Sequence, residues 1–193
     1  MNRINNLHDV FDSPVEFLSD PDLLASGNWI AKTRANKVVR FITSDDIKDE
    51  TLYSAKDKKL DLVYLNMAEI WSKNSHCKRM QVGCLIVKNK SIISDGYNGS
   101  PTGFPNQCED ANNQTLAYVL HAEANALTKL AKSTQSSDGG TLYVTVSPCF
   151  ECSKLIIQSG IKRVVFKEVY RKPESLKFLY EAGIEIVRLE KLI

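Results

Sequence analysis

The sequence predicts an α/β fold, a three-layer α/β/α sandwich built around a five-stranded mixed sheet. Two observations support this prediction. From residue 121 onward, helical and strand patterns alternate, which is typical of parallel strands joined by right-handed helical crossovers. Before that point, an apolar run at 82–87 and a second run from residue 92 are separated by the polar residues 88–91, which indicates an antiparallel hairpin. The hairpin would lie on one side of the parallel strands.

The chain divides into two parts of different character. Its 193 residues are enough for one well-buried domain and little more, and we assign that domain to residues 58–193. Residues 1–57 contain no cysteine and are interrupted by Pro14, Pro21 and Gly27, so we interpret them as an N-terminal extension with local structure. Within it, residues 38–42 fit either a strand or a helix end. An oligomer arm, a lid and an artefact of the assigned start codon are all open as its role.

The elements of the domain follow from apolar spacing and turn residues. One helix is predicted to end near Ser75, and its apolar residues are spaced three and four apart: Leu60, Val63, Tyr64, Met67 and Trp71. Residues 98–115 are rich in Gly, Pro and Asn, which predicts a long loop of the kind that is usually functional. The remaining elements are predicted as helix 121–132, strand 141–146, helix 149–159, strand 163–167, helix 173–182 and strand 185–189. Gly160 and Gly183 are placed to end two of these helices.

Composition excludes several classes of protein. The net charge is only +2, and neither sign forms a long block, which favours a small-molecule substrate over a nucleic acid partner. No apolar run approaches the roughly 20 residues that cross a bilayer, and no secretory signal is visible. Five cysteines, an odd count without an export signal, favour reduced thiols over a disulfide framework. We therefore expect a cytoplasmic protein without a membrane partner.

A split motif indicates a metal centre. His121-Ala122-Glu123 opens one predicted helix, and Pro148-Cys149-Phe150-Glu151-Cys152 opens another. One imidazole and two thiolates, from His121, Cys149 and Cys152, make three protein ligands for Zn²⁺, and a catalytic zinc site keeps its fourth position for water. The helix starts favour nearby negative charge and so favour the thiolates. Such a site lowers the pKa of bound water from 15.7 to about 7. Glu123 is placed to handle the protons of that water.

The combination of the two halves is more specific than either half alone. A lone C-x-x-C is more often a structural zinc half-site or a redox pair, and a lone H-x-E on a helix usually has no function. A closed structural site would also need a fourth ligand, and none stands beside the three. Together, H-x-E and P-C-x-x-C form the signature of zinc-dependent nucleobase deaminases, in which hydroxide attacks the amidine-like carbon of a base. Hydrolytic deamination is the predicted reaction.

Four motifs in order extend this signature over residues 60 to 190: Gln81-Val82-Gly83, Gly96-Tyr97-Asn98-Gly99-Ser100-Pro101, His121-Ala122-Glu123-Ala124-Asn125-Ala126 and Ser147-Pro148-Cys149-Phe150-Glu151-Cys152. In these residues the chain resembles the cytidine and deoxycytidylate deaminase superfamily, and most of all its deoxycytidylate (dCMP) deaminases. The resemblance implies a cytidine-deaminase-like sandwich and a zinc-dependent hydrolase that converts dCMP to dUMP and ammonia, supplying dUMP for thymidylate synthesis. Two alternatives stay open: the same zinc core acting on tRNA adenosine, a free base or a nucleoside, and a catalytically silent zinc scaffold.

The resemblance also implies substrate contacts. Asn98 would hydrogen-bond the sugar, the backbone around Ala122 and Ser147 would contact the pyrimidine edge, and Tyr170 would stack on or flank the base. Arg79 and Arg171 are the candidates for binding a phosphate. Each side chain also has an ordinary interpretation: Tyr170 as a wall of the core, Asn98 as a turn residue and the arginines as solvated surface charges.

Further partners follow from the resemblance alone. Relatives often form homo-oligomers, including hexamers, and respond to dCTP and dTTP as effectors; Lys132 lies in the corresponding region. Some relatives carry a second, structural zinc. Here Cys77 and Cys108 could supply two ligands, with His76, Glu109 or Asp110 as possible partners, but the further histidine or cysteine that relatives have upstream of the catalytic His is absent, so no convincing four-ligand set can be completed. We therefore predict one catalytic Zn²⁺ per chain. Cys84, inside a predicted strand, is expected to be a small core residue.

Overall fold

Five strands form the mixed sheet that the sequence predicts. The structure is a computed structural model, and it describes residues 29–32, 38–42, 55–170 and 174–189. The strands are β3 (Gly83–Lys88), β4 (Ser91–Tyr97), β5 (Thr141–Val146), β6 (Arg163–Glu168) and β7 (Glu185–Arg188). They are ordered β4-β3-β5-β6-β7. Strand β3 pairs antiparallel with β4 and β5, whereas β5, β6 and β7 run parallel. The predicted hairpin and the predicted parallel set are both confirmed.

Two strands from the N-terminal extension lengthen the sheet beyond β7. Strand β2 (Val38–Ile42) runs parallel to β7, with Phe41 opposite Ile186, and β1 (Trp29–Lys32) pairs antiparallel with β2. The ambiguous segment 38–42 is therefore a strand, while β1 was not predicted. A seven-stranded sheet results, and part of the extension belongs to the same sheet as the domain.

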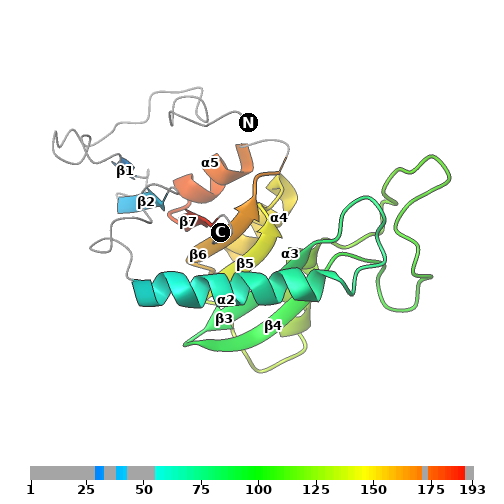
Figure 1. Cartoon of the computed structure of the whole chain (residues 1–193), viewed down its shortest axis with the longest axis horizontal. Helices are drawn as coiled ribbons and strands as arrows, with labels where there is room; N and C mark the ends of the chain where they lie inside the picture. The colour runs from blue at the N-terminus through cyan, green and yellow to red at the C-terminus, as the bar shows by residue number, and fades with distance from the viewer. Residues whose placement is uncertain (1–28, 33–37, 43–54, 171–173, 190–193) are drawn as a thin grey trace.

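Helices cover both faces of the sheet (Figure 1). One face carries α2 (Ala55–Ser72), whose side chains pack with every second residue of the strands, such as Leu85, Tyr143 and Val165. The other face carries α3 (Ala122–Leu130), α4 (Phe150–Gln158) and α5 (Glu174–Glu181). The alternate strand residues, including Ile86 and Phe166, are buried beneath them. The three-layer prediction is confirmed, with helix ends that differ from the predicted ones by up to two residues for α3, α4 and α5.

Helix α2 buries a face that coincides only partly with the one that its apolar spacing suggests: Tyr64 is buried and Leu60 packs against the core, but the other residues of the pattern are exposed. Leu62, Leu65 and Ala68 are at most 8% exposed, whereas Val63 and Met67 are 46% and 40% exposed. The buried face also carries polar residues, including Asp61, so hydrophobicity alone does not mark it. The helix begins at Ala55, five residues before the first apolar residue of the predicted pattern. The outer face is consequently an exposed apolar stripe, and we return to it below.

Asp61 is buried and forms an ion pair with Arg163. Both of its carboxylate oxygens accept hydrogen bonds from Arg163, at 2.9 and 2.6 Å, and the Tyr143 hydroxyl donates to it at 2.6 Å. Burial and the neighbouring Asp61 carboxylate raise the pKa of Tyr143, so the hydroxyl keeps its proton and remains a donor. Arg163 also donates to Glu185 at 2.9 Å. The network ties α2 to the first residues of β6 and β7.

Two glycines allow helices to contact the strands closely. A side chain at Gly96 on β4 would collide with the backbone of Ala122 and Ala126, and a side chain at Gly83 on β3 would collide with the backbone of Ala68 in α2. Any larger residue at Gly96 would push the start of α3 away from the sheet. Gly96 therefore helps to position His121, which directly precedes α3. Gly160 and Gly183 take positive φ after α4 and α5, as predicted.

Of the helices in the described part of the chain, none combines the length and apolar character needed to cross a membrane. The expected cytoplasmic location stays a prediction. Residues 98–115 form the predicted long loop, which extends away from the sheet beyond the end of α2 (Figure 1).

Candidate active site

The two halves of the split motif meet at the carboxyl ends of the parallel strands. His121 and Cys149 are the N-cap residues of α3 and α4, and both have extended backbone angles. Cys149 follows closely on the end of β5, so the chain enters α4 directly from the sheet. In open α/β sheets, this edge is where functional groups converge. The structure thus places the ligand candidates at two helix N-termini, as predicted.

The geometry of the three ligand candidates fits Zn²⁺. His121 Nδ1 lies 3.4 Å from Cys149 Sγ and 3.5 Å from Cys152 Sγ, and all three ligand atoms lie within 4.8 Å of one another. In tetrahedral coordination, Zn–S bonds of about 2.3 Å and Zn–N bonds of about 2.0 Å separate nitrogen and sulfur by about 3.5 Å. Among the described residues, no other group of three or more His, Cys, Asp and Glu is arranged to hold a metal. His121, Cys149 and Cys152 are a zinc-binding group.

The electrostatics of this group favour a thiolate. The hydrogen bond from Cys152, together with the one from His121, lowers the pKa of Cys149 to about 4. The same contact with Cys149 raises the pKa of Cys152, because Cys152 keeps the shared proton. A hydrogen bond to Cys149 raises the pKa of His121. Cys149 is therefore a ready thiolate ligand beside a partner that gives up its proton when a cation arrives.

Glu123 lies in the first turn of α3, two residues from His121, and is 4% exposed. Burial raises the pKa of its carboxyl group, which suits a group that both accepts and donates a proton near neutral pH. Its neighbour Ala122 is fully buried against the sheet. The burial of Ala122 fixes the first turn of α3, which carries Glu123.

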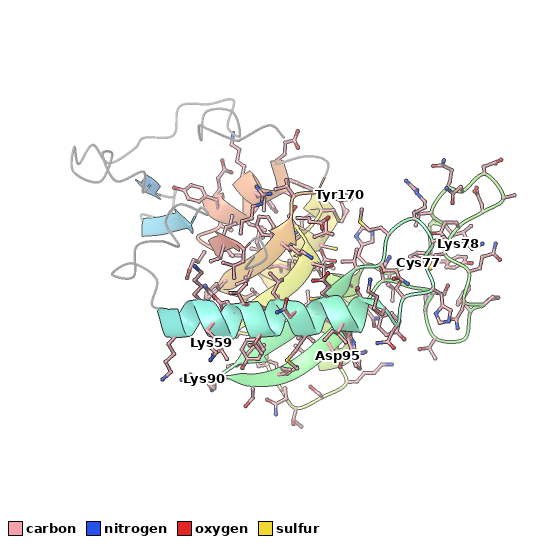
Figure 2. All side chains as sticks on the ribbon, in the orientation of Figure 1. Lys59, Cys77, Lys78, Lys90, Asp95 and Tyr170 are labelled. Atoms are coloured by element: carbon pink, nitrogen blue, oxygen red, sulfur yellow. A yellow bond between two sulfur atoms is a disulfide. The ribbon has the colours of Figure 1, made fainter. Side chains whose placement is uncertain are left out.

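A cavity of about 190 Å³ opens over this group. His121, Glu123 and Cys149 line it, and so does each predicted substrate-binding residue: Asn98, Ala122, Ser147, Tyr170 and Arg79. Tyr170 follows β6, just beyond the strand's carboxyl end (Figure 2). Arg171 lies outside the described residues. One cavity thus brings together residues from four separate sequence motifs.

The polar groups of this cavity are held by backbone contacts. Asn98 accepts a hydrogen bond from the Val82 amide and donates one to the Met80 carbonyl, both at 2.8 Å. An amide side chain can form further hydrogen bonds, so this arrangement orients Asn98 without using its full capacity. Ser147 accepts a hydrogen bond from the Tyr170 amide at 2.7 Å, which links the ends of β5 and β6. The two segments that flank the cavity therefore have a defined position.

Several residues line the cavity without having been predicted to do so: Cys77 and Glu109, which the sequence offered only as possible ligands of a second zinc, and Thr115. Glu109 is 8% exposed, and its carboxylate accepts hydrogen bonds from the amides of Lys78 and Arg79, at 3.0 and 3.2 Å. The sequence indicated that loop 98–115 is functional, but a carboxylate in a polar loop usually points to solvent. Only the return of the loop onto residues 77–79 brings the Glu109 carboxylate to these two amides and to the cavity.

The structure corrects the expectation that the cysteines are reduced. Cys77 and Cys108 form a disulfide, with their Cα atoms 5.1 Å apart, and Cys84, Cys149 and Cys152 are free. The pair is 31 residues apart in sequence, and the contact depends on the long loop returning to the end of α2. Figure 2 shows Cys77 and Lys78 in this loop region. Cys84 is fully buried in β3, consistent with the expected core residue.

Comparison with known proteins agrees with this site. Residues 58–168 match the family described as the cytidine and deoxycytidylate deaminase zinc-binding region. The deoxycytidylate deaminase of Enterobacteria phage T4 is 36% identical over 170 residues, covering 66% of this chain and 88% of the phage protein. That of Saccharomyces cerevisiae is 33% identical over 167 residues, covering 79% of this chain, which spans about half (53%) of the yeast protein.

A solved structure has a similar fold. It is that of the dCMP deaminase from the cyanophage S-TIM5 in complex with dCMP and dUMP, which is 45% identical to this chain. The match has a TM-score of 0.67 and covers 68% of this chain and 97% of the cyanophage protein.

Proposed function

Because the chain belongs to the cytidine and deoxycytidylate deaminase family, we propose that it is a zinc-dependent hydrolase that converts dCMP to dUMP and ammonia. One observation carries this proposal: His121 and Cys149 of the zinc-binding group line one cavity together with the buried Glu123 and Arg79. The product would feed thymidylate synthesis.

The chain's residues divide the chemistry among them. His121, Cys149 and Cys152 would hold the ion, which when bound supplies a hydroxide nucleophile at neutral pH. Glu123 would accept a proton in the cavity, deliver it to the pyrimidine ring nitrogen and assist the departure of ammonia. Its burial raises the pKa of the carboxyl group, which favours the protonated form that the donating step needs.

The remaining cavity residues suit a deoxynucleotide. Tyr170 would flank the base, the backbone at Ala122 and Ser147 would contact its edge, and Asn98 would face the sugar. Arg79 is an exposed cation at the cavity, and among the described residues no carboxylate lies within ion-pair distance of its guanidinium. A guanidinium without an acidic partner is well suited to bind a phosphate.

The exposed stripe on α2 supports a homo-oligomer. Val63, Met67, Ile70 and Trp71 lie on its outer face at helical spacing, and Ile70 is 70% exposed. Contiguous apolar side chains of this kind mark interaction surfaces, and a second copy of the chain would cover them. A hexamer and regulation by dCTP and dTTP, with Lys132 near the effector, belong to the same proposal.

The deciding experiment measures ammonia release from dCMP, dCTP, deoxycytidine, cytosine and guanine by the wild type, and by E123A. We expect turnover of dCMP above the others and loss of turnover in the variant. Wild-type protein that releases no ammonia from any substrate, or an E123A variant that keeps zinc and near-full activity, would overturn the proposal. Preferential turnover of another substrate would reassign the specificity.

A further inference from the structure

Two stretches of chain are joined at three places beside the cavity. Cys77 is linked to Cys108 by the disulfide, and the Glu109 carboxylate accepts hydrogen bonds from the amides of Lys78 and Arg79. The guanidinium of Arg79 donates to the Thr115 hydroxyl at 3.1 Å. We call residues 77–79 with Cys108, Glu109 and Thr115 the loop clamp.

The loop clamp is internally supported. Glu109 and Thr115 face each other across an isolated antiparallel bridge, and the Cys108 carbonyl accepts a hydrogen bond from the Leu116 amide at 2.8 Å. The Glu109 carbonyl accepts a further hydrogen bond from the Gln107 side chain at 2.9 Å. The two arms of the loop therefore support each other and hold the three residues that contact residues 77–79, which are Cys108, Glu109 and Thr115.

Two contacts of the loop clamp are made by Arg79, the positively charged residue that lines the cavity. Arg79 lies two residues after Cys77, which forms the disulfide. Its backbone amide donates to the Glu109 carboxylate, and its guanidinium donates to the Thr115 hydroxyl. An exposed arginine otherwise samples many rotamers, and ordering it on binding costs entropy. Fixing both ends of Arg79 before the substrate arrives reduces that loss.

The charge of Glu109 makes the arrangement unusual. A buried carboxylate lines the same cavity as the group that would bind a phosphate. By Coulomb's law alone, this negative charge opposes a bound phosphate. The two amide hydrogen bonds provide a reason for its presence, because an ionised acceptor holds amides more firmly than a neutral one.

Resting on the proposed function, we propose that the loop clamp positions Arg79 for the substrate phosphate and thereby sets the preference for a nucleotide over a nucleoside. Glu109 and the disulfide are positioning groups in this arrangement, and Arg79 is the group that contacts the substrate.

The proposal is tested by whether substitution of Glu109 raises or lowers the KM for dCMP. In E109A, the amides of residues 78 and 79 lose their acceptor, and we expect the KM for dCMP to rise about tenfold with kcat within about twofold. In E109Q, an acceptor oxygen remains while the charge is lost, so we expect KM to stay within about threefold of the wild type. D110N is the matched control for the loss of one loop carboxylate: Asp110 accepts hydrogen bonds only within its own turn, from Asn112 and Gln114. Its KM should not change.

A charge effect would give the opposite result. If Glu109 acted only by repelling phosphate, both E109A and E109Q would lower the KM for dCMP, and the loop clamp would be refuted. A double-mutant cycle gives a second measurement: after R79A, adding E109A should change kcat/KM for dCMP by less than about twofold. If the losses of kcat/KM in R79A and E109A added up in the double variant, the loop clamp would also be refuted. Where deoxycytidine is turned over, its kcat/KM should be the same in E109A and wild type; an equal loss on both substrates would place Glu109 at the nucleoside instead.

The covalent half of the loop clamp is tested with C77S/C108S. Intact-mass measurement of the wild type should show the loss of two hydrogen atoms relative to the reduced chain, and zinc content should be one per chain in both proteins. The double variant should raise the KM for dCMP with kcat nearly unchanged. If the wild type held a second zinc that the variant lacked, Cys77 and Cys108 would be ligands of that zinc, and the disulfide of the loop clamp would be refuted. A wild type that never turns over dCMP would instead refute the proposed function, so the two failures differ.

Discussion

His121 Nδ1 lies 3.4 Å from Cys149 Sγ, although 28 residues separate them in the chain. Each residue caps the start of a helix, and the two helices, α3 and α4, pack on the same face of the sheet. The distance matches the ligand separation of a tetrahedral zinc centre. Several measurable consequences follow from this pair and its surroundings.

Cys149→Ala removes a thiolate from the zinc-binding group. We expect the purified variant to lose its zinc and its activity together, because two ligands seldom retain the ion. Metal analysis beside ammonia release checks this. C84A is a matched cysteine control, since Cys84 is buried in β3 away from the three ligands, and it should keep one zinc per chain. Retained zinc in C149A would show that another residue completes the site.

Glu123→Gln should separate metal binding from catalysis. The amide cannot carry a proton, so we expect kcat to fall by about 10²–10⁴-fold, the usual contribution of a positioned acid/base group. Zinc content should stay at one per chain, because the carboxylate is not among the three ligand candidates. A variant that loses zinc would make Glu123 a ligand, contrary to the proposed role.

Arg79→Ala should weaken the binding of dCMP. We expect KM to rise about tenfold or more, because a charge-assisted contact to phosphate is lost, with kcat changed less. Lys73→Ala removes an exposed positive charge from the turn after α2 and controls for net charge. Steady-state kinetics at low and moderate salt would measure both. Equal KM values for the two variants would assign phosphate binding to another residue.

Arg163→Met should destabilise the fold without touching the cavity. It leaves the buried Asp61 carboxylate without its cation, and breaking such a pair costs about 3–5 kcal/mol. The comparison is Lys129→Met, which breaks a surface pair with Asp95 and should cost no more than about 1 kcal/mol. Urea denaturation provides the free energies of unfolding. Similar losses in the two variants would show that burial does not set the strength of these pairs.

Ile70→Glu tests the exposed stripe on α2. Ile70 is 70% exposed in the single chain, so the substitution should leave monomer stability nearly unchanged. If a second copy covers the stripe, a buried charge would dissociate the assembly. Light scattering after size exclusion should show a smaller mass than the wild type. An unchanged mass would place the subunit interface elsewhere.

The order of elements could be predicted because each carries its own local signal. Strands β5, β6 and β7 are short apolar runs, and Gly160 and Gly183 end the helices between them. Local signals failed where a polar residue belongs in the core. Asp61 can be buried because it pairs with Arg163, which is 102 positions later in the chain. Since a charged residue lies on the inner face of α2, the spacing of apolar residues does not identify that face.

The same limit applies to the site. His121, Glu123, Cys149 and Cys152 were identified because ligand chemistry requires those residue types at short spacings, which a sequence displays directly. Glu109 was considered only as a possible ligand of a second zinc, because its contact with the amides of residues 78 and 79, about 30 positions earlier, cannot be inferred from spacing. The disulfide was missed for the same reason.

By itself, the sequence determined the fold class and the zinc-binding group and pointed to Glu123 as the proposed acid/base residue, since each rests on periodicity or on residues close together in the chain. Only the tertiary structure decided which face of α2 is buried, that two strands of the extension join the sheet, and that a disulfide and Glu109 hold Arg79. These depend on contacts between distant segments, whose energies arise only after the chain has folded.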